Sequence, residues 1–135
     1  PIMSTLSLST IINSCFNDRV ATNIHPATKS FKALRIAVND ELAELVRGLE
    51  AAERILQPGG ELVVVTFHSL EDRRVKRFIR DQEQGIKLPK NLPIRDIDRG
   101  VRLVKVGKAI KPATSEVSGN IRSRSAVMRI AMRIA

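Results

Sequence analysis

The sequence predicts an α/β fold, and three observations carry this prediction. A long helical region precedes a continuous apolar, β-branched run at Leu62–Phe67, which is typical of a buried strand. A basic helix follows that run directly. Two further strand-like segments, Val101–Val106 and Val127–Ile134, come near the end of the sequence. This order indicates the last part of a layered α/β domain, in which other strands must flank Leu62–Phe67.

Helical signals dominate the first part of the chain. A short helix is expected at Thr5–Phe16, and His25-Pro26 opens a longer helical region because proline suits a first turn. One apolar stripe with spacings of three and four residues runs along this region: Leu34, Val38, Leu42, Leu45, Leu49, Ala52 and Leu56. Asn39-Asp40-Glu41 is an alternative cap that would divide it into two helices. Gln57-Pro58-Gly59-Gly60 ends the region.

The later elements follow from the same patterns. We expect Leu62–Phe67 to be a parallel strand covered on both faces. A helix at Leu70–Gln82 would bury Val75, Phe78 and Ile79 and expose the basic residues Arg73, Arg74, Lys76, Arg77 and Arg80. Residues 83–100 are expected to form a long exposed loop. Ser115-Glu116-Val117 suits one helical turn. The tail Val127–Ile134 fits either a strand or a helical face, and we choose a strand because Val101–Val106 needs a sheet partner.

Charge is distributed unevenly along the chain. The formal net charge is +9, yet residues 1–66 carry six Lys/Arg against seven Asp/Glu, and residues 67–135 carry seventeen against seven. A basic half beside a neutral half indicates an oriented contact with a polyanion, most simply nucleic acid. Solvated surface charge is the plainer alternative. Tyr and Trp are absent, which argues against binding of single strands through a row of stacking aromatics.

Composition and motifs argue against several classes of protein. No apolar run reaches the roughly 20 residues of a membrane span, and no leader pattern is visible. The single Cys15 cannot form an internal disulfide, which suits a reducing compartment. Glycine-rich phosphate loops, a nucleophile elbow and zinc-ligand spacing are all missing, so no metal site is expected. Because the chain begins with Pro1, we expect a processed or truncated product.

The first of three polar clusters follows the predicted buried strand. Its candidate site residues are His68, Glu71, Asp72 and Arg73, placed where the carboxyl end of a strand commonly meets a ligand. A structural alternative is a capped helix start, with Ser69 as N-cap and the two acidic residues favoured by the positive helix end. Capping does not require an imidazole, so His68 is the strongest functional candidate of the four.

The other two polar clusters are Asn120–Ser125, before the predicted tail strand, and His25–Phe31, at the start of the long helical region. Asn120–Ser125 contains Arg122, Ser123 and Arg124, a suitable grip for RNA phosphates, although a solvated loop is the alternative. His25–Phe31 stands at a helix entrance, where capping is the favoured role over anion binding. The helix residues Arg74, Arg77 and Arg80 would add long-range attraction for RNA.

Together, these clusters resemble one family. His25–Leu42 is similar to its HPATRTFQALRIxVNxEL segment, Phe67–Lys76 to FHSLEDRxVK, and Asn120–Ser125 to NPRSRS. The family is the small-subunit ribosomal RNA (cytosine-N4)-methyltransferases, also called ribosomal RNA small subunit methyltransferase H. The departures are small: Lys29 for Arg, Lys32 for Gln, and Ile121 for Pro, which removes a rigid φ from the arginine turn.

The resemblance implies the C-terminal part of a Rossmann-like class I methyltransferase sheet plus the later part of a helical insertion domain. Residues 1–56 would be the insertion and the helix leading into the core, and residues 57–135 the core. The activity implied is S-adenosyl-L-methionine-dependent methylation of N4 of a cytosine in 16S rRNA, in the cytoplasm. The cofactor site is expected upstream of residue 1, so the fragment alone would be inactive. The small ribosomal subunit is the implied partner, no membrane is involved, and a homodimer is left open.

Two other readings compete with a piece of an enzyme. A non-catalytic rRNA- or ribosome-binding module would suit the basic half and the missing cofactor loop. A glycine-rich loop encoded upstream of Pro1 would favour the enzyme, and an immediate start codon would favour the module. A helical protein-interaction domain rests only on the apolar stripe from Leu34 to Leu56, and such stripes mostly pack on their own core.

Overall fold

The computed structural model describes residues 1–16, 25–86 and 100–134. The chain divides into two compact units, residues 1–41 and residues 42–135, and each is considered by itself. Both helices and strands are present, so the predicted mixed α/β class is confirmed. Among the described residues, no helix combines the length and the apolar character needed to cross a lipid bilayer.

In its described residues, the first unit holds two helices, α1 (Thr5–Cys15) and α2 (Ala27–Asn39). The side chain of Ser4 caps α1 by accepting a hydrogen bond from the Ser7 amide at 3.1 Å. This satisfies one of the amides that the first turn of a helix leaves unpaired. The helix predicted at Thr5–Phe16 is therefore confirmed to within one residue.

The long helical region is broken at Asp40, which adopts a left-handed conformation with φ of 51°. Aspartate tolerates this region of backbone space better than most residues, so the break costs little conformational energy. A new helix, α3 (Glu41–Ile55), begins directly afterwards. The division at Asn39-Asp40-Glu41 is therefore correct, and the apolar stripe is shared between two helices. Its first part, Leu34 and Val38, is exposed on α2, whereas its later part reaches the core.

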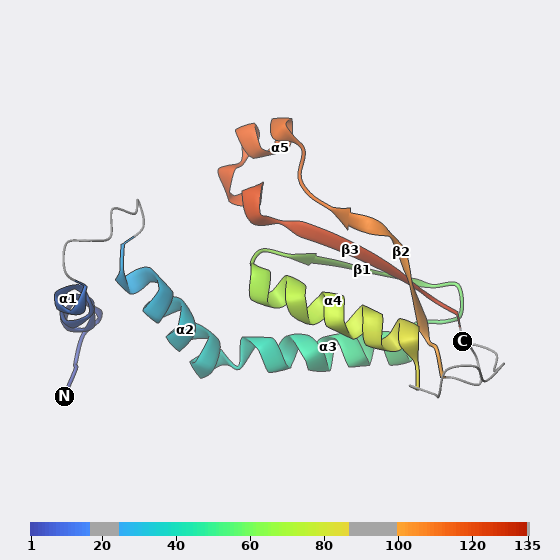
Figure 1. Ribbon diagram of the computed structural model, residues 1–135, viewed down its shortest axis with the longest axis horizontal. Coiled ribbons are helices and arrows are strands. Elements are labelled where there is room, and N and C mark those ends of the chain that lie inside the picture. Colours follow the sequence, from blue (N-terminus) through green and yellow to red (C-terminus); the bar gives the residue numbers. More distant parts are fainter. Residues whose placement is uncertain (17–24, 87–99, 135) are drawn as a thin grey trace. The chain divides into compact units, whose positions relative to one another are not determined.

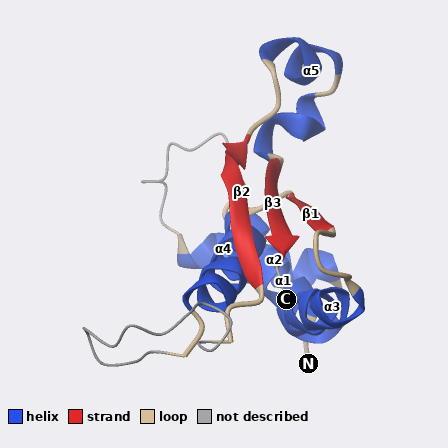
Figure 2. Cartoon of the chain, turned by 90° about the vertical axis from the view of Figure 1, so that its right-hand side faces the viewer, coloured by secondary structure: helices blue, strands red, loops and turns tan. Residues whose placement is uncertain are grey.

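The described residues of the second unit form a three-stranded antiparallel sheet. The strands are β1 (Glu61–Thr66), β2 (Leu103–Ile110) and β3 (Val127–Arg133), in the order β1-β3-β2. The tail is thus a strand, as predicted, and it pairs with both of the others (Figure 2). The expectation of a parallel β1 was wrong for the described strands, because its pairing with β3 is antiparallel. An apolar run alone does not report strand direction.

Helices α3 and α4 (Ser69–Gln84) cover one face of this sheet (Figure 1). The core between the helices and the sheet consists of six buried side chains from α3, α4 and the three strands: Leu49, Leu62, Val75, Ile79, Leu103 and Ala131. Partly buried apolar residues pack against this core. Of the three residues predicted to be buried, Val75 and Ile79 are buried, and Phe78 is partly buried against the core. Burial of such side chains stabilises the fold by about 1.5–3 kcal/mol each.

The opposite face of the sheet is not covered by any described residue. Val63 and Val65 point to this open face and are 50% and 49% exposed. In the antiparallel register they lie beside Ile130 and Met128, which adds apolar surface to the same face. Coverage of β1 on both faces is therefore not found within the described chain. Half-exposed apolar side chains on one face of an edge strand form a surface suited to packing against further structure.

Strand β2 continues four residues beyond the predicted end at Val106. Its pairing with β3 becomes irregular between Val106 and Ile110, and Gly107 takes a positive φ of 65° there. Glycine adopts this conformation without a Cβ clash, so the strand passes through the irregularity instead of stopping. The predicted loop at 83–100 lies mostly outside the described residues, although α4 itself extends to Gln84.

A buried ion cluster fixes α3 to the end of the sheet. Glu53 is 4% exposed, and its carboxylate accepts a hydrogen bond from Arg133 Nη1 at 2.6 Å. Arg133 also donates to the Glu53 backbone carbonyl, and Arg102 lies 3.5 Å from the carboxylate on the more exposed side. Buried charges persist only when they are paired and hydrogen-bonded, as Glu53 is.

Candidate functional site

Two of the predicted polar clusters meet at one end of the sheet. The register pairs Thr66, the last residue of β1, with Val127, the first residue of β3, and the Thr66 hydroxyl donates to the Val127 carbonyl at 3.3 Å. The turn after β1 and the turn before β3 therefore lie at the same end (Figure 1). We call this end, formed by residues 67–72 and 120–125, the polar end.

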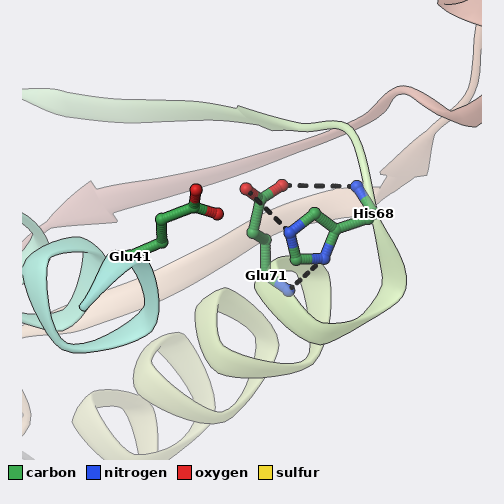
Figure 3. Close-up of side chains that lie close together, drawn as sticks. All are labelled: Glu41, His68 and Glu71. Atoms are coloured by element: carbon green, nitrogen blue, oxygen red, sulfur yellow. Dashed lines mark hydrogen bonds and ion pairs between the residues drawn. The ribbon is translucent and has the colours of Figure 1, made fainter. Parts of the chain in front are cut away.

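His68 is the N-cap of α4, and it forms a reciprocal capping box with Glu71. The Glu71 amide donates to His68 Nδ1 at 3.4 Å, and Glu71 Oε2 accepts from the His68 amide at 3.3 Å (Figure 3). Glu71 Oε2 also accepts from the Phe67 amide at 3.0 Å. Two orphan amides of the turn and one of the helix start are thereby satisfied. The helix starts one residue earlier than predicted, so Ser69 is not the cap.

The same contacts select one tautomer of the neutral imidazole. Because Nδ1 accepts from the Glu71 amide, the proton of the neutral ring belongs on Nε2. Nε2 lies 3.1 Å from Glu71 Oε1, too poorly aligned to count as a hydrogen bond. Both ring nitrogens therefore face Glu71, and the imidazole acts as an oriented cap. The sequence argument that capping does not require an imidazole missed this use of the ring.

Asp72 forms the strongest ion pair of the polar end. Its carboxylate accepts two hydrogen bonds from Arg129 of β3, at 2.7 Å from Nε and 3.0 Å from Nη2. The hydrogen bond and charge of Arg129, with a smaller contribution from Lys76, hold the pKa of Asp72 below its usual value against the opposing effect of burial. The two-pronged geometry ties the first turn of α4 to the middle strand.

Sequence reasoning missed Arg129 as a partner for Asp72. The residues are 57 positions apart, and the sequence analysis gave Arg129 no role beyond its place in the predicted tail strand. An arginine within an apolar strand needs a paired acceptor wherever that strand is covered, and this was the available signal. The acceptor could not be chosen without the register of β1 and β3.

The predicted RNA-binding arginines of α4 are exposed. Arg74, Arg77 and Arg80 carry this prediction, and Arg73 of the first polar cluster is exposed as well. Spacings of three and four residues place the four arginines on one side of the helix. Arg80 also donates two hydrogen bonds to its neighbour Asp81. The structure thus brings the basic residues of α4 into one exposed stripe that begins at the polar end.

The arginine-rich turn before β3 is a 3₁₀ helix, η1 (Ile121–Ser125), which follows the short helix α5 (Thr114–Gly119). Asn120 caps η1 by accepting from the Arg122 amide at 3.1 Å. Ser123 is 6% exposed, and its hydroxyl donates to the Asn120 carbonyl at 2.8 Å. Ser123 therefore holds the turn from within.

The two arginines of η1 differ from Ser123. Both are exposed, and Arg124 donates to the Ile121 carbonyl at 3.1 Å while the rest of its guanidinium stays available. Arg122 uses only its backbone amide in the turn. Guanidinium groups presented in this way suit phosphate oxygens.

The third cluster, at the start of α2, has a structural use. His25 Nδ1 accepts a hydrogen bond from the Ala27 amide at 3.2 Å, and its Nε2 lies 3.2 Å from the side-chain amide of Asn13 on α1. This agrees with the capping role that the sequence favoured for His25–Phe31.

Comparison with known proteins identifies the family. Residues 1–134 match the MraW methylase family. The chain belongs to this family. Among curated proteins, it is 51% identical over 134 residues to a ribosomal RNA small subunit methyltransferase H of Marinomonas sp. (strain MWYL1), covering 99% of this chain and 43% of that protein. The resemblance expected from the three sequence motifs is thus confirmed.

Two further relatives carry the same name. The protein of Legionella pneumophila (strain Paris) is 48% identical over 135 residues, which cover 100% of this chain and 44% of that relative. The protein of Thioalkalivibrio sulfidiphilus (strain HL-EbGR7) is 55% identical over 112 residues, 82% of this chain and 36% of that relative. The chain therefore spans less than half the length of these three relatives.

Proposed function

We propose that this chain is the C-terminal part of an S-adenosyl-L-methionine-dependent methyltransferase that modifies N4 of a cytosine in small-subunit rRNA. The observation that carries the proposal is the match of nearly the whole chain to the MraW methylase family and to rRNA methyltransferases about half identical to it. Such an enzyme would meet its substrate, the small ribosomal subunit or its rRNA, in the cytoplasm.

The open side of the sheet supports a larger, Rossmann-like domain. Val63 and Val65 are half exposed on β1, and β1 is an edge strand of the described sheet. Layered α/β domains cover both faces of the sheet with helices and extend it with parallel strands. We assign residues 57–135 to this core, and residues 1–56 to the later part of a helical insertion and the helix leading into the core.

The cofactor site is proposed to lie in the part of the full-length protein that precedes residue 1. S-adenosyl-L-methionine supplies an electrophilic methyl group, and no described residue is assigned to hold it. We therefore propose that residues 1–135 alone do not turn over. The share of the relatives that the chain covers, 43–44%, leaves room for such a site.

The contribution of this chain would be substrate positioning. Transfer to an exocyclic amine depends mainly on alignment of the amine and on loss of its proton. Arg122 and Arg124 are exposed at the same end of the sheet as the hydrogen-bonded turn that contains His68, Glu71 and Asp72. We propose that the arginines hold rRNA phosphates and that the hydrogen-bonded turn gives this end of the sheet a defined structure, with Arg73 exposed at its edge.

Methyl transfer by the full-length protein tests the proposal. Small ribosomal subunits that lack the modification would be incubated with isotopically labelled S-adenosyl-L-methionine, digested to nucleosides and analysed by mass spectrometry. We expect label in N4-methylcytidine from one position of the rRNA, and none with residues 1–135 alone. Label in another nucleoside would overturn the assigned substrate atom. RNA binding without any methyl transfer would favour the non-catalytic binding module.

A further inference from the structure

A cavity of about 330 Å³ lies between helix α4 and strand β2, and none of its lining residues belongs to the two turns of the polar end. It is formed where the pairing of β2 becomes irregular, between Val106 and Ile110. Gly107 lines it with a φ of 65°, and no atom lies within 4 Å of the position that a Cβ there would occupy. Irregularities of this kind redirect the backbone and commonly accompany binding sites.

The charges around this α4–β2 pocket are almost all positive. Its lining contains five cationic side chains, one from β3 and two each from α4 and β2: Lys76, Arg80, Lys105, Lys108 and Arg129. The single acidic residue of the lining is Glu83, and its carboxylate accepts a hydrogen bond from the Lys105 amide at 3.4 Å. The pocket therefore favours an anion.

The five cationic side chains differ in whether they already form an ion pair within the protein. Arg129 binds Asp72, and Arg80 binds Asp81. Within residues 1–16, 25–86 and 100–134, none of the three lysines forms an ion pair. Lys76 is exposed on α4, and Lys105 and Lys108 lie on the exposed part of β2, on either side of Gly107.

The remainder of the lining is apolar. The buried Ile79 of α4 and the small residues Gly107 and Ala109 of β2 form walls beside the lysines. Ligand sites commonly combine apolar walls with a few placed polar groups, in volumes of about 300–1,000 Å³. A nucleotide has the matching chemistry, because its base and ribose suit apolar walls and its phosphate suits the lysines.

We propose that the α4–β2 pocket binds one nucleotide of an RNA strand, with the phosphate held by Lys105 and Lys108. The proposal rests on the proposed function only in taking rRNA as that strand. The pocket begins at Lys76, one helical turn after Asp72 at the polar end, and Arg73 and Arg74 lie between these two residues on α4. Arg77 and Arg80 continue the exposed basic stripe along the helix, and Arg80 itself lines the pocket. The basic stripe would guide the strand from the arginine turn to the pocket.

Introducing a negative charge into the pocket tests this proposal. In the full-length protein, Ala109→Glu places a carboxylate in the lining, and Ala109→Gln is a control of the same size without the charge. We expect the dissociation constant for unmodified small subunits, and for a short single-stranded RNA, to rise about tenfold with the glutamate and less than about twofold with the glutamine. Equal RNA binding by both variants would overturn the proposal that the pocket binds a nucleotide.

A second measurement locates the ligand. Acetylation of Lys105 and Lys108 by a reactive ester would be followed by mass spectrometry in the presence of single-stranded RNA, cytidine monophosphate, inorganic phosphate or polyglutamate. We expect strong protection by the RNA and weaker protection by the mononucleotide at equal concentration. Equal protection by phosphate or polyglutamate would overturn a nucleotide site in favour of a general anion site.

The outcomes separate this proposal from the proposed function. If Ala109→Glu leaves RNA binding and lysine protection unchanged while methyl transfer continues, the pocket proposal fails and the enzyme assignment stands. If RNA protects the lysines but no methyl group is transferred, the pocket proposal stands and the enzyme assignment fails.

Discussion

The two turns at the polar end use their charged residues in opposite ways. After β1, the side chains of His68, Glu71 and Asp72 are bonded to the protein itself, through the capping box and the pair with Arg129. Before β3, Ser123 alone turns inward, and Arg122 and Arg124 are left exposed. Both turns contain residues that suit chemistry, yet only the second leaves its charges free to meet a ligand.

The difference shows that residue type and position do not define a binding site by themselves. Each polar atom must also be traced to its partner, because a group already hydrogen-bonded within the fold has less to offer a substrate. On this basis, the turn after β1 is support and the turn before β3 is contact surface. Replacing residues of the two turns should therefore separate effects on stability from effects on RNA binding.

The largest effect on stability is expected at Asp72. Asp72→Asn in the full-length protein removes the charge that pairs with the partly buried Arg129, and should lower the free energy of unfolding by about 2 kcal/mol. Chemical denaturation measures this difference. Asp81→Asn is the matched control, because its pair with Arg80 is exposed and should contribute less than about 0.5 kcal/mol. Equal effects of the two changes would show that the Asp72 pair is not special.

The pH dependence of the same variant sharpens this prediction. The pKa of Asp72 is lowered in the folded state by Arg129, so its stabilising effect is present above the unfolded pKa of about 4 and is lost as the pH falls through the folded value. The stability difference between the wild type and Asp72→Asn should hold constant from pH 7 to about pH 5 and shrink in more acidic solution. A difference that grew on acidification would contradict the assigned cause.

A smaller effect is expected at His68. His68→Ala removes the side-chain acceptor of the Glu71 amide and should lower the free energy of unfolding by about 1 kcal/mol. His68→Asn keeps a side-chain acceptor at the N-cap, so it should recover most of that stability and retain methyl transfer. Denaturation and the methylation assay would be run on both variants. A stable but inactive asparagine variant would show that the imidazole contacts the substrate.

The elements of this fold were largely predictable because their signals are local. The apolar run at Leu62–Phe67, the helix after it, and the tail strand each follow from periodicity within one segment. Even the break at Asp40 was visible as a candidate cap. The family motifs were equally readable, since they are contiguous in sequence.

The partners within the site were less predictable because they join distant segments. The contact of Asp72 with Arg129 depends on the register of β3 against β1, and the pocket depends on where β2 becomes irregular. The role of His68 was missed for another reason: capping usually employs Ser, Thr, Asp or Asn, so a histidine was interpreted as functional. The antiparallel pairing of β1 with β3 was not predicted, because apolar runs occur in both parallel and antiparallel sheets.

The smallest effect on stability, and the clearest effect on binding, is expected in η1. Arg122→Ala with Arg124→Ala removes two exposed guanidinium groups and should change the free energy of unfolding by less than about 0.5 kcal/mol. It should weaken rRNA binding, and lower the slope of log affinity against log salt by about 1.4–1.8 for two lost phosphate contacts. Arg47→Ala with Arg54→Ala removes the same charge from α3 and controls for net charge. An unchanged salt slope would mean that the η1 arginines serve the turn itself, and then both turns of the polar end would be structural.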